Sequence, residues 1–243
     1  MKVISTFIAC LIAGSLFAQT IIDKSVPVNA GQALKVHFDY PELVKISTWD
    51  KNEISVKASV SINGGENDDA FKLDINTGGK AIEIKNEIKN MDGLPHRVTV
   101  NHNGMKMVFR NQQEWEKYSE EHGKPKYSNM NMGIDMDIII EIKVPVNMET
   151  SVTSVYGMVE VKEFKGPLSV QATYGGVDVT LNESATGELI AETNYGHIYS
   201  GLKTKFQDSR EEDFHTYVSA KPGSGPKYRF ESPYGSIYLR KDQ

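Results

Sequence analysis

Hydrophobic and polar residues alternate along most of this chain, and such alternation is typical of half-buried β-strands. In segment 135–144, Met136, Ile138 and Ile140 share one parity, opposite Asp137 and Glu141. Further segments with apolar residues in alternating positions are 33–39, 42–48, 52–62, 70–75 and 81–88. Turn-forming pieces rich in Gly, Asn and Asp separate them, as they do between strands. The pattern therefore predicts an all-β protein.

One stretch departs from this alternation. Trp115 and Tyr118 are three residues apart, which places them on one face of a helix. Asn111 followed by Glu114 fits a capping box, and Gly123 fits a helix stop. We predict a short helix at 112–122, followed by a loop at 124–133, inside an insertion that spans 91–133.

A Tyr-Gly phrase recurs four times in the last third of the chain. Its members are Tyr156-Gly157, Tyr174-Gly175, Tyr195-Gly196 and Tyr234-Gly235. The first two steps cover 18 and 21 residues, and the last covers 39. Because Tyr217 in "HTYVSA" lies midway in the long step, we interpret it as a degenerate copy, which gives a period of about 20 residues.

The residues around each Tyr-Gly pair have fixed character. Those four positions before the tyrosine are apolar: Val152, Val170, Ala191 and Phe230. Those two before are small: Ser154, Ala172, Thr193 and Ser232. Those three after are β-branched: Val159, Val177, Ile198 and Ile237. The sets before and after have opposite parity, and a continuous strand cannot bury both. We therefore predict a corner at each glycine, with the glycine at positive φ and the tyrosine on the inward parity.

These features together predict a β-solenoid. A period near 20 residues is too short for a propeller blade, and the leucine-rich repeat pattern is absent. A single-stranded β-helix with one coil per repeat would stack like residues at the strand spacing. We assign 20–145 to an N-terminal strand region of the solenoid, which carries the insertion, and 146–243 to the Tyr-Gly coils.

The N-terminus has the layout of a secretory signal peptide. Lys2 precedes an apolar run from Val3 to Phe17, which Ala18 closes. We place the signal peptide at 1–19. Cys10, the only cysteine, lies within the apolar run, so we reject lipid anchoring. The chain is predicted to be exported, to the periplasm or to the cell surface in association with the outer membrane, with no transmembrane segment.

Several of these stretches carry a family resemblance. The exported chain, the segment "YPELVKISTWDKNEISVKA" and the Tyr-Gly coils ending "SPYGSIYLRK" resemble the bacterial putative-adhesin family, a domain of unknown function. The resemblance is best at 27–62 and 134–243, and the insertion departs from it. It implies a right-handed β-solenoid in the cell envelope, and it brings no catalytic residues.

Two surfaces are candidates for ligand contact. The tyrosine column is either a structural corner ladder, which its inward parity favours, or a strip on which sugars stack. Four positions after each tyrosine lies an outward column, the candidate ligand face: Glu160, Asp178, Tyr199 and Tyr238. Glu160 and Asp178 are the one acid pair on adjacent coils that an enzyme could use, and solvated surface charges are the favoured interpretation.

Metal sites and cofactors are not predicted. Met105, Met107, Met130, Met132 and Met136 could offer soft ligands to Cu(I), but methionines commonly fill irregular cores. The acidic turns "GGENDDAF" and "DSREEDFH" lack the spacing of a calcium loop. The net charge of −5 is spread along the chain without basic runs, so we expect no binding to nucleic acid.

We therefore predict an exported, non-catalytic, adhesin-like interaction module, whose partner is an envelope protein or a polysaccharide. The alternative is a polysaccharide lyase or hydrolase of the β-helix type, although the chain lacks the compact catalytic fingerprints. A homo-oligomer is expected to form through the solenoid edge, at the C-terminal strand "SIYLRK".

Overall fold

The computed structural model describes residues 19–102, 104–123 and 129–242. The predicted signal peptide lies outside the described residues, apart from Gln19. The described chain is mostly β-strand with one α-helix, as the alternation predicted. That helix is too short to cross a membrane, and the described ranges hold no other α-helix.

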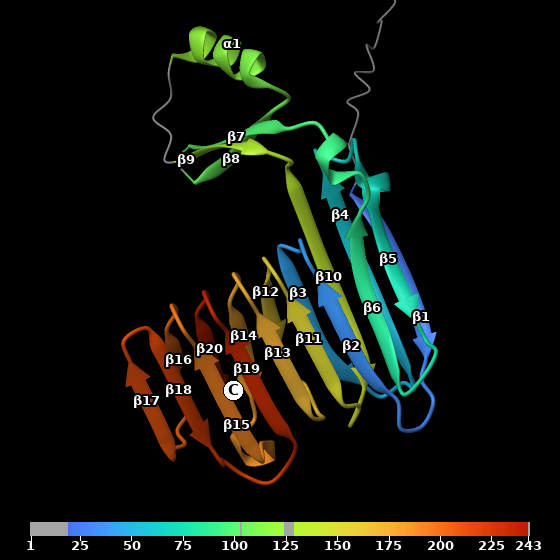
Figure 1. Cartoon of the computed structure of the whole chain (residues 1–243), viewed down its shortest axis with the longest axis vertical. Helices are drawn as coiled ribbons and strands as arrows, with labels where there is room; N and C mark the ends of the chain where they lie inside the picture. Colours follow the sequence, from blue (N-terminus) through green and yellow to red (C-terminus); the bar gives the residue numbers. More distant parts are fainter. Residues whose placement is uncertain (1–18, 103, 124–128, 243) are drawn as a thin grey trace, which may run out of the picture.

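Two large sheets face each other across the main core (Figure 1). The eight-stranded sheet has the order β1 (Thr20–Pro27), β4 (Glu53–Ile62), β10 (Met136–Pro145), β3 (Leu43–Trp49), β12 (Met158–Val161), β14 (Val177–Leu181), β20 (Ile237–Lys241), β16 (Ile198–Ser200). The nine-stranded sheet has the order β17 (Asp208–Glu212), β18 (His215–Ala220), β15 (Glu188–Thr193), β19 (Lys227–Ser232), β13 (Leu168–Ala172), β11 (Thr150–Ser154), β2 (Ala33–Phe38), β6 (Ala81–Ile88), β5 (Phe71–Asn76). Short 3₁₀ turns are η1 (Asp68–Ala70), η2 (Met91–Gly93) and η3 (Glu183–Ala185).

Pairs of consecutive strands are the repeating unit of this architecture. Each unit places its first strand in the nine-stranded sheet, turns a corner, and places its second strand in the eight-stranded sheet. The units are β2–β3, β11–β12, β13–β14, β15–β16 and β19–β20, and neighbouring units pair in parallel and in register. The predicted corners at the Tyr-Gly pairs lie between the two strands of a unit.

The all-β prediction is confirmed, but the predicted β-solenoid is not shown. The sheets are mixed and form no closed solenoid. Antiparallel pairs β1/β4, β4/β10 and β5/β6 build one end, and β15/β18 and β17/β18 build the other. The sequence period of about 20 residues cannot reveal these ends, because alternation looks the same in parallel and antiparallel strands.

Residues 208–220 are not a degenerate coil. They form the antiparallel hairpin β17/β18, and β18 pairs antiparallel with β15. Tyr217 therefore lies within a strand, opposite Glu192 and Arg210, and marks no corner. The even spacing that led to its assignment is a coincidence of hairpin length.

The predicted edge at the C-terminus is also wrong. Strand β20 pairs with β14 on one side and with β16 on the other, and β19 likewise lies between β13 and β15. The C-terminal unit thus enters the stack between two units that precede it in sequence. The edge of the eight-stranded sheet at this end is the three-residue strand β16.

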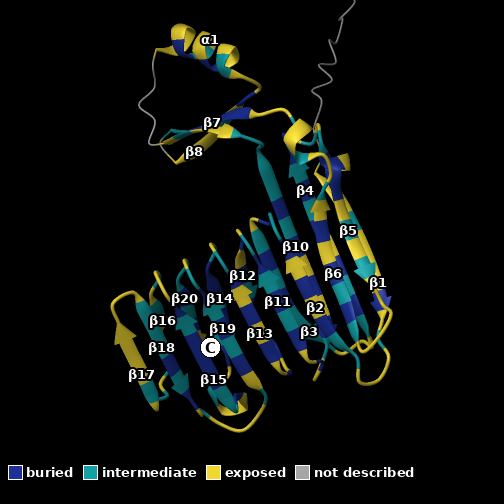
Figure 2. Ribbon diagram, viewed as in Figure 1, coloured by how far each residue is buried: buried dark blue, intermediate teal, exposed yellow. Residues whose placement is uncertain are grey.

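The core consists of the residue columns that the repeat predicted. The apolar residues four before each tyrosine and the small residues two before are buried, as are the β-branched residues three after, except Ile198, which is half-buried (Figure 2). Both strands of each unit therefore direct one parity inward, and the corner between them exchanges that parity. This confirms the physical argument for a turn at each repeat.

The insertion forms a small layer of its own. The antiparallel sheet β8 (Met105–Phe109), β7 (Arg97–His102), β9 (Asn129–Gly133) packs under α1 (Gln112–His122). Val98, Val100, Phe109 and Trp115 make a separate hydrophobic cluster. The helix was predicted correctly: the Asn111 side chain accepts a hydrogen bond from the backbone N–H of Glu114, and Gly123 follows the last turn at φ 75°. The loop predicted at 124–133 instead contains β9, while 124–128 lies outside the described residues.

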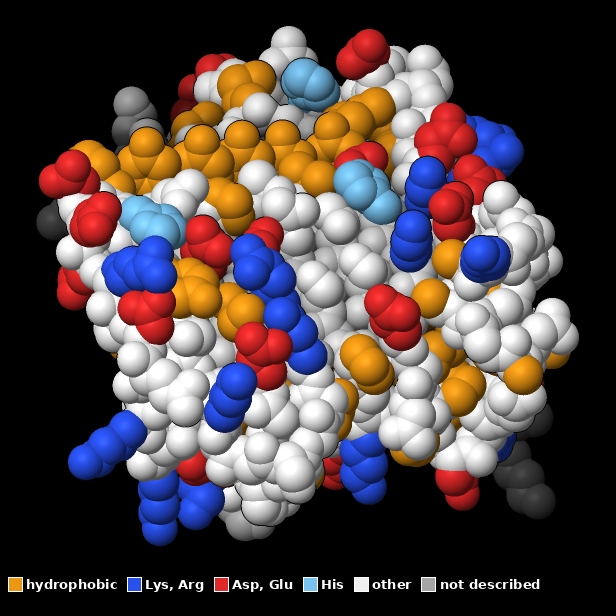
Figure 3. All heavy atoms as spheres, turned by 60° about the horizontal axis from the view of Figure 1, so that its bottom comes forward, with side chains coloured by type: hydrophobic (Ala, Val, Ile, Leu, Met, Phe, Trp, Pro, Cys, Tyr) orange, Lys and Arg blue, Asp and Glu red, His pale blue; other side chains and the backbone are white. Residues whose placement is uncertain are grey.

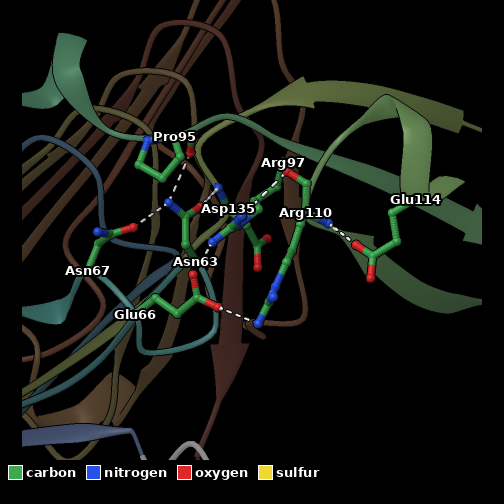
Figure 4. A network of polar contacts seen from close by, with 8 residues as sticks. All are labelled: Asn63, Glu66, Asn67, Pro95, Arg97, Arg110, Glu114 and Asp135. Carbon is green, nitrogen blue, oxygen red and sulfur yellow. Dashed lines mark hydrogen bonds and ion pairs between the residues drawn. The ribbon is translucent and has the colours of Figure 1, made fainter.

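A polar network attaches the insertion to the main body (Figure 4). The buried Arg97 guanidinium pairs with Glu66, and Arg110 reaches the other oxygen of Glu66 at 3.4 Å. The side chain of Asn63 donates to the carbonyl of Pro95 at 3.0 Å and accepts from the backbone N–H of Asp135 at 3.1 Å. The attachment therefore combines this polar network with Leu94, which packs against the main core, whereas the buried hydrophobic clusters on either side are separate.

Removal of the insertion is expected to leave the main body folded. Joining residue 90 to residue 134 through a short Gly-Ser linker removes the separate cluster of Val98, Val100, Phe109 and Trp115, and keeps every buried residue of the main core, although it also removes the half-buried Leu94 that packs against that core. Far-ultraviolet circular dichroism should retain a β spectrum, with a cooperative thermal transition. An aggregated chain, or one that melts without cooperativity, would contradict the prediction.

Candidate functional site

Each Tyr-Gly corner is tied by a side chain that the repeat keeps small. The hydroxyl of Ser154 donates to the carbonyl of Gly157 at 2.8 Å, within its own corner. Ser232 donates to the carbonyl of Gly175 at 2.8 Å, in the neighbouring unit. Thr193 donates to the carbonyl of Gly235 at 3.0 Å. These bonds satisfy carbonyls that the turn removes from the sheets, which is a requirement for buried backbone groups.

The glycines serve a different purpose from the one predicted. None of Gly157, Gly175, Gly196 and Gly235 has positive φ. A Cβ atom would instead collide with backbone of the neighbouring unit: at Gly157 with the carbonyl of Pro41, at Gly175 with that of Gly157, at Gly235 with that of Gly175, and at Gly196 with that of Gly235. Glycine is required at these corners because the backbones of adjacent strand units approach too closely for any side chain.

The tyrosines of these corners point to solvent, contrary to the inward parity that we expected. Tyr156, Tyr174 and Tyr234 are each 53% exposed, and Tyr195 is 60% exposed. Each strand ends two residues before its tyrosine, so strand parity no longer applies when the chain reaches the ring. The turn carries the side chain outward.

The rings stack into one continuous tyrosine ladder. Its order is Tyr40, Tyr156, Tyr174, Tyr234, Tyr195, and it ends on Phe214. Centroids of adjacent tyrosines are 5.0–5.3 Å apart, and their planes differ by 3–14°. Figure 3 shows a continuous row of hydrophobic side chains crossing this surface, in keeping with such a ladder.

Sequence reasoning missed both ends of the ladder. Tyr40 follows β2 by two residues, as Tyr156 follows β11, but proline rather than glycine comes next. The spacing after an alternating strand was the signal that could have identified it. Phe214 lies in the turn of the β17/β18 hairpin and is 69% exposed. No sequence repeat indicates that it belongs to the ladder.

A row of polar side chains runs beside the ladder on the outer face of the nine-stranded sheet. Its members lie three residues before each tyrosine and pair in register: His37, Thr153, Gln171, Glu231 and Glu192. We call this set the polar row. Arg229 pairs with both carboxylates, at 3.0 Å to Glu192, and His215 lies 3.0 Å from Glu192.

The candidate ligand face occupies the outer surface of the eight-stranded sheet. Glu160 pairs in register with Asp178, Asp178 with Tyr238, and Tyr238 with Tyr199. The structure thus places the four residues in one row, with Tyr238 rather than Tyr199 next to Asp178. The rings of Tyr199 and Tyr238 stack at 5.1 Å.

Each carboxylate of this face has a cationic partner. Lys162 lies 2.9 Å from Glu160, and Arg240 binds both oxygens of Asp178 at 2.6 and 2.8 Å. A bidentate arginine–carboxylate pair is a strong and geometrically specific contact. The arrangement supplies paired charges for polar contact.

Several of the other candidate side chains have structural partners. Met107 and Met130 pack on the insertion's hydrophobic cluster, Met136 packs on the main core, and Met105 and Met132 are exposed. Asp68 accepts hydrogen bonds from the backbone N–H groups of Ile62 and Thr20, and Asp208 pairs with Arg210. Within the described ranges, no group of three His, Cys, Asp or Glu side chains could hold a metal ion.

A groove of about 1020 Å³ lies at the opposite corner of the sandwich. Its walls come from the end of β20, from the turns that follow β3, β10, β12 and β14, and from the segment that precedes β19. Phe164 and Leu181 are buried against it, and Tyr228 donates a hydrogen bond to the carbonyl of Phe164 at 2.8 Å. Burial raises the pKa of Tyr228, so its hydroxyl stays protonated. No sequence motif marks this groove, because irregular turns supply its lining.

Carboxylates gather where the insertion meets the main body. Partial burial, and then the charge and hydrogen bond of Asp137, raise the pKa of Glu42 above its ordinary value of 4.5. Lys106 of β8 pairs with Asp135 at 2.6 Å and partly offsets this effect.

Replacing Glu42 with glutamine is expected to stabilise the protein at neutral pH. A raised native-state pKa means that Glu42 contributes stability at low pH, and that this contribution is lost as pH rises through the native-state pKa. Glu42→Gln should therefore melt above the native protein at about pH 7, and the two should converge below about pH 4. Thermal unfolding across this range checks the prediction, and a constant offset would contradict it.

Comparisons with known proteins place the chain at the margin of detectable similarity. No family model matches it, and no curated protein is similar to it. Among solved structures, it is similar to a putative cell adhesion protein from Clostridium sporogenes, with 13% identity and a TM-score of 0.49. The match covers 92% of this chain and all of the other. This similarity is too distant to carry fold details or function, and the family resemblance stays an interpretation of the sequence.

Proposed function

We propose that this protein is an exported, non-catalytic interaction module of the cell envelope, which binds its partner through the tyrosine ladder. The observation that carries the proposal is the ladder itself, in which aromatic side chains from five strand units and a hairpin are gathered on one surface. The signal-peptide pattern at 1–19 supports export.

The size of the ladder favours an interaction site over an incidental exposure. An aromatic side chain has roughly 150–250 Å² to bury. The four corner tyrosines and Phe214 are more than half exposed, whereas Tyr40 is half-buried. The ladder therefore offers roughly 600 Å² of contiguous ring surface, which matches the largest patches on soluble monomers, where such patches are often functional. A protein that needed the rings only for stability would gain more by burying them.

The ladder is also organised before it binds. Every ring rests on its neighbours, so a partner loses little free energy in fixing the side chains. A linear array of equivalent groups suits shallow contact at many points, in which single contacts are weak and their sum is strong. Self-association, if it accompanies binding, would use the edge strand β16 rather than the C-terminal strand.

Retention on cell envelopes tests the proposal. Purified protein is mixed with envelope fragments and sedimented, and it is compared with the triple variant Tyr156→Ser, Tyr174→Ser, Tyr234→Ser. We expect the native protein to sediment with the envelopes and the triple variant to stay in solution. Met105→Ser is the control, because it removes an exposed apolar side chain of the insertion. Circular dichroism verifies that each variant is folded.

Two results would contradict the proposal. The first is equal retention of the native protein and a folded triple variant. The second is release of soluble saccharides at enzymatic rates that Glu160→Gln or Asp178→Asn abolishes, since this would establish the alternative of a polysaccharide-active enzyme.

A further inference from the structure

We infer that the partner of the tyrosine ladder is an extended, uncharged polysaccharide, which lies along the ladder and across the strands with one sugar on each ring. This inference rests on the proposed function and specifies the chemistry of the ligand. It draws on the exposed parts of the rings, on their spacing and on the polar row beside them.

The exposed parts of the rings are their edges and hydroxyls. Because neighbouring planes are nearly parallel at 5.0–5.3 Å, each ring covers the face of the next. A cation or a single planar ligand binds to an open ring face. The stacking within the ladder covers these faces, so it does not favour such ligands. Ring edges carry positive partial charge, and phenolic hydroxyls donate and accept hydrogen bonds. Such a surface suits a partner rich in ether and hydroxyl oxygens.

The spacing of the rings selects among extended polymers. Side chains on one face of an extended polypeptide recur roughly every 6.7 Å, so a peptide laid along the ladder loses register within a few rings. An extended chain of β-1,4-linked pyranoses advances by a distance close to the ring spacing with each sugar. The units pair in register and adjacent tyrosine rings are nearly parallel, so the spacing is maintained along the ladder.

The polar row distinguishes a glycan from a second β-stack, whose strand spacing also matches. Two β-stacks associate through dry, interdigitated side chains. Here the rings have hydrogen-bonding neighbours instead, among them the hydroxyl of Thr153 and the exposed amide of Gln171. The C–H surfaces of a sugar can pack against the tyrosine rings, and its hydroxyls can form hydrogen bonds with the phenolic hydroxyls and with the polar row.

The charges along the polar row indicate an uncharged chain. Glu192 and Glu231 flank one half of the ladder, and Glu211, Glu212 and Asp213 directly precede Phe214 in the sequence. Like charges across an interface oppose binding. An acidic polysaccharide is therefore disfavoured, although Arg229 balances part of the negative charge.

Titration calorimetry with oligosaccharides of defined length tests the inference. The probes are β-1,4-linked oligomers of glucose and of N-acetylglucosamine, with two to eight sugars. We expect the affinity to rise several-fold with each added sugar until the oligomer spans the ladder, at about six sugars, and then to level off. Oligomers of α-1,4-linked glucose have the same composition but curve away from a straight row, and they should bind weakly.

Three variants relate the affinity to the two rows. Tyr174→Ser removes a ring and Gln171→Ala removes an amide of the polar row, and each should weaken binding several-fold. Tyr174→Phe keeps the stack and removes one hydroxyl, so its loss should be smaller than that of Tyr174→Ser. Met105→Ser should bind like the native protein. Thermal melts verify that the variants are folded.

Affinity that is independent of length, equal affinity for α-linked and β-linked oligomers, or full affinity in a folded Gln171→Ala variant would each overturn the inference. Failure here is separable from failure of the proposed function. If the native protein sediments with envelopes and the triple tyrosine variant does not, yet no oligosaccharide binds, the partner of the ladder is another envelope component. This result would support the proposed interaction module and would reject the polysaccharide as its ligand.

Discussion

Replacing Gly175 with alanine is expected to destabilise the protein by about 3 kcal/mol, because the added Cβ has no space. It would collide with the backbone carbonyl of Gly157 in the neighbouring unit. Backbone cannot move aside as a flexible side chain can, so the two units must separate at the corner. For a chain of this length, the loss corresponds to a fall of roughly 6–12 °C in the midpoint of thermal unfolding.

Gly201→Ala is the matched control for this change. The nearest atom to its added Cβ is the carbonyl oxygen of Leu239, at an ordinary contact distance of 3.8 Å. Its effect should stay within about 0.5 kcal/mol. Equal melting temperatures for the two variants would refute the close-approach explanation of the corner glycines.

Truncating Phe230 to alanine is expected to cost about 3–5 kcal/mol of unfolding free energy. Phe230 is fully buried, and its strand neighbours in the same row are the smaller Val170 and Ala191. These neighbours cannot fill the volume that the ring leaves, so a cavity should persist between the sheets. Urea denaturation, analysed for the midpoint and the slope, measures the loss.

Phe214→Ala provides the comparison for Phe230→Ala. The substitution is chemically identical, but Phe214 is 69% exposed at the end of the tyrosine ladder. Its truncation should change the unfolding free energy by no more than about 1 kcal/mol. If both variants lost the same stability, the burial assigned to Phe230 would be wrong.

The sequence was most informative where each position has a single physical requirement. Val152, Val170 and Phe230 must be apolar because they fill the space between the sheets, and their spacing revealed both the strands and the corners. Asn111 and Glu114 likewise predicted the start of α1, since helix capping depends on local contacts alone.

Predictions failed where the outcome depends on contacts between strand units, which sequence spacing does not specify. The tyrosines were expected inside because parity was extended past the last strand residue, for example past Ser154. The corner glycines were wrongly assigned to positive φ. The real reason for glycine, as at Gly175, is the close approach of the neighbouring strand unit, and sequence spacing does not reveal such a tertiary contact. The hairpin at 208–220 and the position of β20 failed for the same reason, since a repeat identifies units without ordering them.

The sequence repeat identified four residues of the candidate site but did not reveal how they are arranged. Tyr156, Tyr174, Tyr195 and Tyr234 were identified by their repeat, and the structure brings them together on one surface. Their order, their exposure and the terminal rings Tyr40 and Phe214 required the fold. The polar row was invisible beforehand, because Thr153, Gln171 and Glu192 share no residue type.

The position of the C-terminal unit has a consequence for synthesis. Strands β19 and β20 emerge from the ribosome after all the other described strands, yet they fill the gap between the unit β13–β14 and the unit β15–β16. Until they arrive, β14 lacks its partner on one side and β15 has only the β18 hairpin. Assembly therefore cannot advance unit by unit from the N-terminus, and the last stage depends on contacts that are distant in sequence and slow to form. A chain interrupted before residue 227 would leave open edges on β13, β14 and β15 and would leave β16 without its partner, whereas synthesis of residues 227–241 closes the stack from within.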